Sequence, residues 1–389
     1  MVMRLTYKYR IYPSRAQRQN LSQTLEACRW LFNKVLETRK SAWEQDRIRV
    51  SQYATVNLIP QWKAGKPELT KVHSQVLQEV CKRVDLAFSA FFRRVKRGEK
   101  PGYPRFRGFG RYDSFTFPQS GFRLLDNGKL RLSKIGDVKI KLHRPLIGKC
   151  KTLTVCCDHV GNWYACFSCD IEPTPLEPSH RIVGIDLGLS TFAYFSDGTK
   201  IDRMRWAKQD EKDIARLQRK KDHSPKDSPE RNKIVHALCH AYKRAANRRK
   251  NFAHQESRQL VNKYQFIVFE DLSIQKMRVT GNKIIRRGIT DVAWDQFVQF
   301  TLYKAENAGR TVILVDPKGT TQICSQCGEV VPKGLSVRIH NCPTCGLVID
   351  RDYNAALNIL ARGLSCISTN LSVAIKAHAL YSWEQSRPV

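Results

Sequence analysis

Four cysteines in the C-terminal part of the sequence have the spacing of a metal site. Cys324 and Cys327 form one CxxC pair, and Cys342 and Cys345 form a second pair after 14 intervening residues. Each pair predicts a tight turn that directs two thiolates to one point, and two such turns supply a tetrahedral shell for Zn²⁺. Because four protein ligands leave no open position for water, one structural zinc ion is expected.

A histidine and the remaining cysteines offer alternatives to this site. His340 can compete as a ligand, although it completes neither turn. Cys156, Cys157, Cys166 and Cys169 lie on expected strands. Cys166 and Cys169 are three residues apart and therefore point to opposite faces of a strand, which favours ordinary packing over a second metal site.

Three acidic residues stand at the ends of apolar segments. Asp186 interrupts the strand RIVGIDLG, Glu270 directly follows FIVF, and Asp352 begins a helix after the second cysteine pair. Carboxylates at the ends of buried strands need a partner to stay ionised, and Mg²⁺ is held by a few carboxylates with waters and substrate phosphates. Two such ions, about 4 Å apart, stabilise the attacking and leaving oxygens of a phosphoryl displacement. The pattern therefore favours a nuclease.

Each of these acids also has a simpler explanation. A carboxylate can begin a turn, cap a following helix or complement the positive end of a helix dipole. Asp271, Asp316 and Asp350 compete for the metal-binding role, and spacing alone does not decide among them. The order strand, strand, helix within a very basic chain favours the nuclease interpretation.

The composition indicates a folded protein with a polyanionic partner. The 389 residues suggest two or three domains at about 150 residues each. Lys and Arg number 67 against 35 acidic residues, a net charge of +32, while the hydrophobic fraction is an ordinary 42%. Nucleic acid is favoured as the partner over an anionic membrane surface or a merely soluble cationic protein.

Exported and membrane-spanning classes are disfavoured by the same sequence. It contains no apolar run of about 18 residues, and its first residues lack the apolar core of a secretory signal. We therefore expect no membrane association. The 13 cysteines are expected to be reduced rather than paired in disulfides.

Local patterns predict the elements that position these residues. A strand over 3–12 is followed by an N-cap at Ser14 with Gln17 completing a capping box, and by helices up to residue 97. Short strands then indicate a β-barrel or sandwich, which the first strand can join. The predicted strands are 114–117, 129–132, 137–142, 152–157 and 163–170.

From residue 181 strands alternate with helices, which indicates an α/β sheet. Two charged helices are expected over 203–263, with a break around 223–229, and further helices over 292–307 and 353–362. The last 25 or so residues show no clear pattern. The predicted strands are 182–185, 191–195, 266–269 and 311–315.

Two segments carry most of the positive charge. Residues 91–151 contain 17 basic and 4 acidic residues, and residues 203–250 contain 16 and 6. Cationic side chains bind along phosphate backbones, and aromatic rings stack on unpaired bases. Most of the aromatic residues are nevertheless expected in hydrophobic cores, and the second segment can also be a solvated helical face. The candidate nucleic-acid contacts are Tyr103, Arg105, Phe106, Arg107, Arg219, Lys220, Lys221, Arg248, Arg249 and Lys250.

Several segments resemble the TnpB proteins of IS200/IS605-type transposons, which are related to the compact Cas12 effectors. The most specific are GIDLGLSTFA, FEDLSI, TTQICSQCGEV and RIHNCPTCGLVIDRDYNAALNI. YKYRIYPSRAQ, KPGYPRFR and NFAHQESRQLV are similar to the same family, so the resemblance covers about residues 3–362.

The resemblance implies a multidomain α+β protein. Residues 181–323 and 351–362 would form an RNase H-like (RuvC) α/β nuclease domain, with a zinc ribbon inserted at 324–350. An N-terminal wedge-type β-barrel would comprise 1–12 and 100–180, with a helical recognition domain inserted at 13–99. Residues 363–389 would be a C-terminal tail, expected to be loosely held.

The family consists of RNA-guided DNA endonucleases, so the resemblance implies guide RNA and target DNA as partners and recognition of a short target-adjacent motif. Its catalytic acids map onto Asp186, Glu270 and Asp352, which would hold two Mg²⁺ ions. Arg338 occupies an arginine position that would approach the scissile phosphate. A monomer in the ribonucleoprotein and a cytoplasmic, nucleoid-associated location in a prokaryote are expected.

Two alternatives to this function stay open at the level of the sequence. One is a guide-independent RuvC-like nuclease or transposase accessory protein. The other is a zinc-ribbon regulator that binds nucleic acid without catalysis, against which the three intact acids argue.

Overall fold

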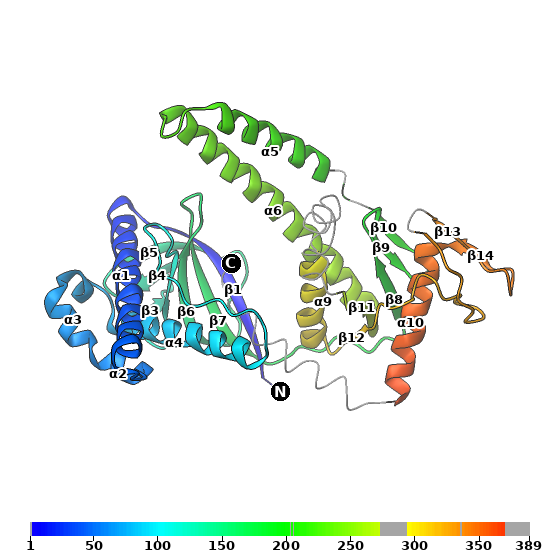
Figure 1. Cartoon of the computed structure of the whole chain (residues 1–389), viewed down its shortest axis with the longest axis horizontal. Coiled ribbons are helices and arrows are strands. Elements are labelled where there is room, and N and C mark those ends of the chain that lie inside the picture. The colour runs from blue at the N-terminus through cyan, green and yellow to red at the C-terminus, as the bar shows by residue number, and fades with distance from the viewer. Residues whose placement is uncertain (1, 203, 205, 273–293, 335–336, 370–389) are drawn as a thin grey trace. The chain divides into compact units, whose positions relative to one another are not determined.

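The computed structural model describes residues 2–202, 204, 206–272, 294–334 and 337–369. The chain divides into two compact units, Met1–Glu172 and Pro173–Val389. Each unit contains its own β-sheet with helices packed on it (Figure 1). None of the helices in the described ranges combines the length and the apolar character needed to cross a membrane.

The first unit contains a barrel-like sheet of seven antiparallel strands, in the order β2-β6-β7-β1-β5-β4-β3. The N-terminal strand β1 lies inside this sheet, between β7 and β5. Large side chains that are fully buried fill its interior, among them Tyr9, Phe115 and Phe167. The strands are β1 (Met3–Tyr12), β2 (Ser114–Phe117), β3 (Phe122–Leu124), β4 (Lys129–Leu132), β5 (Gly136–Lys141), β6 (Lys149–Cys157) and β7 (Trp163–Ile171).

The helices of this unit lie between β1 and β2 in the chain. The predicted capping box is confirmed, because the Gln17 backbone N–H donates to Ser14 Oγ at 3.3 Å and the Ser14 N–H donates to Gln17 Oε1 at 3.0 Å. Buried apolar residues such as Leu31 and Leu77 lie on α1 and α4, which pack together. The helices are α1 (Arg15–Asp46), α2 (Gln52–Asn57), α3 (Ile59–Gly65), the 3₁₀ helix η1 (Pro67–Lys71) and α4 (Ser74–Lys96).

The second unit contains a five-stranded mixed sheet in the order β10-β9-β8-β11-β12. Strands β8, β11 and β12 are parallel, whereas β9 pairs antiparallel with both β8 and β10. The strands are β8 (Ile182–Leu187), β9 (Thr191–Phe195), β10 (Lys200–Asp202), β11 (Phe266–Glu270) and β12 (Thr311–Val315). The helices are α5 (Trp206–His223), α6 (Pro229–Lys263), α9 (Trp294–Ala308) and α10 (Arg351–Thr369). A two-stranded hairpin, β13 (Ile339–Asn341) and β14 (Val348–Asp350), precedes α10.

Alternate residues of the central strands face different helices. Ile185 and Phe269 join the hydrophobic cluster that contains buried residues of α6 and α9. Val268, one position earlier on β11, packs instead with Ile359 of α10. Because side chains alternate along a strand, Asp186 and Glu270 lie on the face that α10 covers.

Most of the strands and helices predicted from the sequence are present, with differences at short elements and at the end. The three-residue strands β3, β10, β13 and β14 were not predicted, because such a length carries too little alternation to be detected. Helix α10 continues to Thr369, beyond the predicted end at residue 362, because apolar residues continue at helical spacing. The expected start of the preceding helix at Val292 and the tail over 370–389 lie outside the described residues.

Helix α10 approaches β8 closely at Gly184. A Cβ atom at this position would lie 2.5 Å from the backbone nitrogen of Leu360 and even closer to the carbonyl oxygen of Ala356. We predict that Gly184→Ala destabilises the protein by about 1–3 kcal/mol, because the backbone of α10 would have to move. Urea-induced unfolding checks this value. Gly65→Ala is the matched control, since nothing lies within 4 Å of that position, and equal stability of the two variants would contradict the prediction.

Candidate active site and cysteine cluster

Two of the three predicted acids lie side by side on neighbouring parallel strands. Ile185 of β8 pairs with Phe269 of β11, so the next residues, Asp186 and Glu270, extend from adjacent positions in the sheet. Both are largely buried, with exposed fractions of 8% and 9%. The carboxyl ends of parallel strands thus bring together two acids that are 84 positions apart in the sequence.

The third acid, Asp352, lies in the first turn of α10 and is 8% exposed. This position places its charge at the positive end of the helix dipole. Asp350 has a different role, because its Oδ1 accepts the backbone N–H groups of Asp352 at 2.8 Å and Tyr353 at 3.2 Å. Asp350 therefore caps the helix from an exposed position, and Asp352 is the one buried beneath it.

The other competing acids are exposed. Asp271 follows β11 with its side chain exposed. The Oδ1 atom of Asp316 accepts the backbone N–H of Lys318 at 3.0 Å, which is an ordinary turn contact. Burial thus separates Asp186, Glu270 and Asp352 from their competitors, a distinction that spacing could not make.

The buried acids repel one another. Burial raises the pKa of Asp186 well above its usual value, and the nearby charges of Glu270 and Asp352 raise it further. Burial also raises the pKa of Glu270, against a hydrogen bond that Thr320 Oγ1 donates to Glu270 Oε1. An arrangement of this kind disfavours three negative charges unless a cation joins them.

Two arginines lie beside Asp352. The Arg351 side chain is largely buried, donates to Asp352 Oδ1 from Nη2 at 3.1 Å, and donates to the carbonyl oxygen of Val337 at 3.0 Å. The predicted Arg338 has one terminal nitrogen 3.7 Å from Asp352 Oδ2 and a side chain that is 56% exposed. Arg338 can therefore face a ligand, whereas Arg351 positions the acid.

Two polar residues of α10 that hold the segment 320–325 were not predicted from the sequence. Asn354 accepts the Ser325 backbone N–H at 2.9 Å and donates to the carbonyl oxygen of Ile323 at 2.8 Å. Asn358, one turn later, donates to the carbonyl oxygens of Thr320 and Ile323 at 2.8 and 2.7 Å. Two asparagines four residues apart on an otherwise apolar helix face were the available signal.

The four predicted cysteines are brought together. Their sulfur atoms all lie within 4.8 Å of one another, and the Cys324–Cys345 and Cys327–Cys342 pairs are each 3.6 Å apart. Among the described residues, no other group of three or more histidine, cysteine, aspartate or glutamate side chains is close enough together to hold a single ion. The three acids are therefore less tightly gathered than the cysteines.

Each CxxC pair forms the expected tight turn. The Gly328 N–H donates to the Cys324 carbonyl at 2.9 Å, and the Gly346 N–H donates to the Cys342 carbonyl at 3.0 Å. Both glycines have left-handed φ angles, +80° and +73°, which side chains disfavour. The backbone N–H of Cys345 contributes most to lowering the pKa of Cys342 to about 6, which favours a thiolate.

The alternative ligands lie apart from this group. His340 is fully buried, and its Nδ1 atom contacts Lys333 Nζ rather than completing the cluster. Cys156 and Cys157 lie on β6, and Cys166 and Cys169 on β7, within the antiparallel sheet of the first unit. Among the described residues they form no further group of metal-binding type.

The predicted contacts in the Gly/Pro-rich loop differ in their surroundings. Tyr103 packs edge-on against Phe88 and Phe91, with ring centroids 5.7 and 5.3 Å apart, so it serves partly as core. Phe106 is 53% exposed. Arg105 and Arg107 are also exposed, and the Arg107 backbone is bound to α1 through Asn33.

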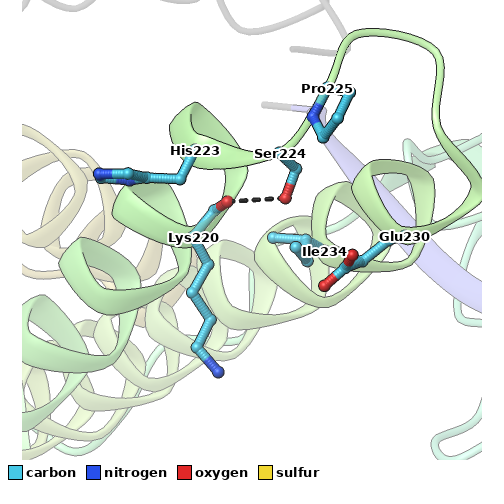
Figure 2. Close-up of a pocket in the computed structure, with 6 residues that line it drawn as sticks. All are labelled: Lys220, His223, Ser224, Pro225, Glu230 and Ile234. Atoms are coloured by element: carbon cyan, nitrogen blue, oxygen red, sulfur yellow. Dashed lines mark hydrogen bonds between the residues drawn. The ribbon is translucent and has the colours of Figure 1, made fainter.

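The other predicted contacts lie on the α5–α6 hairpin. Arg219 and Lys220 are exposed near its tip, where the Ser224 hydroxyl donates to the Lys220 carbonyl at 2.8 Å (Figure 2). Lys221 Nζ lies 3.2 Å from Asp222 Oδ1, and Arg248 Nη1 lies 2.8 Å from Asp210 Oδ1, so both cations form ion pairs. Arg249 is half-buried and Lys250 exposed, and both have partners within the protein.

Family profiles match three parts of the chain. Residues 166–280 match one described as "Probable transposase", and residues 294–359 match the "Cas12f1-like, TNB domain". Residues 1–47 match a "Helix-turn-helix domain", although the structure shows β1 followed by one long helix there.

Relatives align with nearly the whole chain. A protein of Streptomyces pristinaespiralis, provisionally named an RNA-guided DNA endonuclease, is 33% identical and aligns over 92% of this chain and 89% of its own length. InsQ of Escherichia coli K12, named in the same provisional way, is 28% identical over 92% of each chain.

The fold also has a counterpart among solved structures. A Cas12f1 protein, solved in complex with single-guide RNA and target DNA, aligns with a TM-score of 0.56 and 13% identity, covering 92% of this chain and 98% of that one. With the motifs, the profile matches and the relative of 33% identity, this identifies the chain as a member of the TnpB family of IS200/IS605-type transposons, related to the compact Cas12 proteins.

Proposed function

We propose that this protein is an RNA-guided DNA endonuclease. It binds a transposon-derived guide RNA, recognises a short target-adjacent motif and hydrolyses DNA phosphodiesters at one RuvC-type site. The observation that carries the proposal is the burial of Asp186 beside Glu270 and Asp352 where α10 begins, within a family whose relatives are named as RNA-guided DNA endonucleases.

The acids fit a divalent cation. Their oxygens are hard ligands of the kind that Mg²⁺ takes, and their mutual repulsion is the unfavourable charge that such an ion would remove. Two Mg²⁺ ions would be held by Asp186, Glu270 and Asp352. When bound, the metal supplies Lewis acidity and a nucleophilic water or hydroxide for phosphodiester hydrolysis.

The surrounding residues would position the acids and the DNA. Thr320 orients Glu270 through its hydroxyl, and Arg351 holds Asp352 in place. Arg338, exposed beside Asp352, would contact the phosphate that is cut.

The second unit supports a RuvC assignment of its sheet. Parallel strands β8, β11 and β12, the antiparallel pair β9–β10, and a helix that carries the last acid suit an RNase H-like domain over 181–323 and 351–362. In this proposal residues 324–350 are an inserted zinc ribbon whose four thiolates bind one Zn²⁺. The first unit, which ends at Glu172, would then supply most of the wedge barrel, proposed as 1–12 and 100–180, and the recognition helices, proposed as 13–99.

The basic segments would bind the nucleic acids. The exposed residues of the α5–α6 hairpin suit the backbone of a guide–target duplex, because cations track phosphates irrespective of sequence. The loop around Phe106 suits unpaired nucleotides. A monomer within the ribonucleoprotein, in the cytoplasm beside the nucleoid, completes the proposal.

Guide dependence is the central test. We expect a discrete RNA to copurify with the protein, and we expect target cleavage to be lost when the protein is treated with RNase before assembly. Sequencing the copurified RNA and following cleavage of a matched and a mismatched target measure this. Unchanged cleavage after RNase treatment would support a guide-independent nuclease instead.

Substitution of Asp186 tests the role of the acids in cleavage. Asp186→Asn should reduce cleavage about a thousandfold or more, since metal-assisted hydrolysis contributes several kcal/mol. Asp271→Asn is the matched control, because that exposed acid neighbours Glu270 without sharing its burial, and it should retain activity. Cleavage rates at saturating Mg²⁺ check both, and full activity of Asp186→Asn would refute the assignment.

The same variant has an expected effect on stability. Because the folded pKa of Asp186 is raised, its ionised form destabilises the fold, and stability falls as the pH rises from about 4 through the folded pKa. In Mg²⁺-free buffer at pH 7, Asp186→Asn should therefore unfold at a higher temperature than the wild type, with the gain disappearing near pH 4. Mg²⁺ should stabilise the wild type more than the variant.

Substitution of single cysteines tests whether the cluster binds zinc. Elemental analysis should find about one zinc per chain, and Cys342→Ser should remove it, because a hydroxyl is a poor replacement for a thiolate ligand. Cys366→Ser, at an exposed cysteine of α10 outside the cluster, should keep the metal. Cys342→Ser protein with its zinc content unchanged would exclude the site.

A further inference from the structure

A small pocket lies between one face of α1 and the loop that follows α4. Its volume is about 160 Å³. This is below the roughly 300–1,000 Å³ of typical small-molecule sites, so it admits one planar ring system rather than a whole cofactor. The residues that line it are Arg29, Trp30, Asn33, Lys34 and Glu37 of α1, and Phe106 of the loop.

The loop is held on α1 by hydrogen bonds to the residue next to Phe106. Asn33 accepts the Arg107 backbone N–H at 2.7 Å and donates from its amide to the Arg107 carbonyl at 2.9 Å. Arg29 donates to the same carbonyl at 2.8 Å. Three hydrogen bonds to one residue fix the loop backbone, so the position of Phe106 is preorganised rather than adjustable.

Two aromatic rings line this pocket, and both remain accessible. Phe106 is 53% exposed and Trp30 is half-buried, with Lys66 Nζ 5.8 Å from the Trp30 ring centroid. Tyr103, in the same loop, packs edge-on against Phe88 instead of lining the pocket. A ring kept half in water beside a second ring is suited to stacking on a ligand.

The polar groups around the rings suit a nucleotide. Lys34 and Glu37 form an ion pair of 2.8 Å at the pocket, which offers both a donor and an acceptor to the edge of a heterocycle. The loop belongs to the segment 91–151, which has 17 basic and 4 acidic residues and so attracts phosphates.

We propose that this pocket binds one unpaired nucleobase of a single-stranded nucleic acid, stacked on Phe106 and Trp30. Stacking is tolerant of sequence, because every base presents a π-face. The inference rests on the proposed function only in taking nucleic acid as the ligand. Guide RNA and a displaced DNA strand are the two sources of such a nucleotide.

The test compares Phe106→Ala with Phe109→Ala in the full-length protein, freed of copurified RNA and kept in Mg²⁺-free buffer. Phe109 is 87% exposed in the same loop but does not line the pocket. Fluorescence anisotropy measures binding to oligouridine, to oligothymidine and to a DNA duplex, each of about 12 nucleotides or base pairs. Phe106→Ala should weaken single-strand binding roughly tenfold, while Phe106→Tyr, Phe109→Ala and all duplex affinities stay within about twofold.

A larger loss on oligouridine assigns the pocket to RNA, and a larger loss on oligothymidine assigns it to single-stranded DNA. Equal losses for Phe106→Ala and Phe109→Ala, an equal loss on the duplex, or no single-strand binding by the wild type would overturn the proposal. Because binding is measured without cleavage, the result is separate from guide dependence. If cleavage proved independent of a guide while Phe106→Ala still weakened single-strand binding, the proposed function would be refuted and the nucleobase pocket supported.

Discussion

Helix α10 lies against β8 at a residue that has no side chain, and the arrangement of the second unit depends on this contact. With Gly184 beneath Ala356 and Leu360, the helix reaches the sheet at backbone distance. Its first turn then carries Asp352 over the ends of the strands that bear Asp186 and Glu270. A bulkier residue would move α10 outward and separate the acids.

The same helix connects these acids to the cysteine cluster. Asn354 and Asn358 hold the chain where it enters the segment between β12 and α10 that contains the cysteines. At its exit, the Arg351 backbone N–H donates to the Arg338 carbonyl at 2.8 Å, and the Arg351 side chain pairs with Asp352. The segment that contains the cysteines is therefore connected to Asp352 through Arg351, although the group of four cysteines includes none of the acids.

The charge of the chain is divided between surface and interior in a way that suits a protein of this family. Basic side chains are mostly exposed and can exchange counterions for phosphates, whereas the three central acids are buried and repel one another. A positive surface attracts a polyanion, and the proposed function adds that the buried acids would retain a cation against the +32 net charge of the chain. In the first unit, the pocket lined by Trp30 of α1 and Phe106 places two aromatic rings beside the basic loop that follows α4.

Features that depend on neighbouring residues could be predicted from the sequence. The CxxC turns, the capping box at Ser14 and the acids at strand ends each involve a few consecutive positions, whose spacing fixes the local geometry. The family motifs further indicated that nearly the whole chain resembles the TnpB proteins, and they favoured Asp352 over Asp350 as the third catalytic acid.

The tertiary structure decided what depends on residues far apart in the chain. Asp350 and Asp352 have the same side chain two positions apart, and only packing shows that one caps α10 from the surface while the other is buried. Thr320 meets Glu270, and Asn33 meets the loop at Arg107, across 50 and 74 positions. No local pattern encodes such contacts, because they arise when separate elements bury their apolar faces against one another.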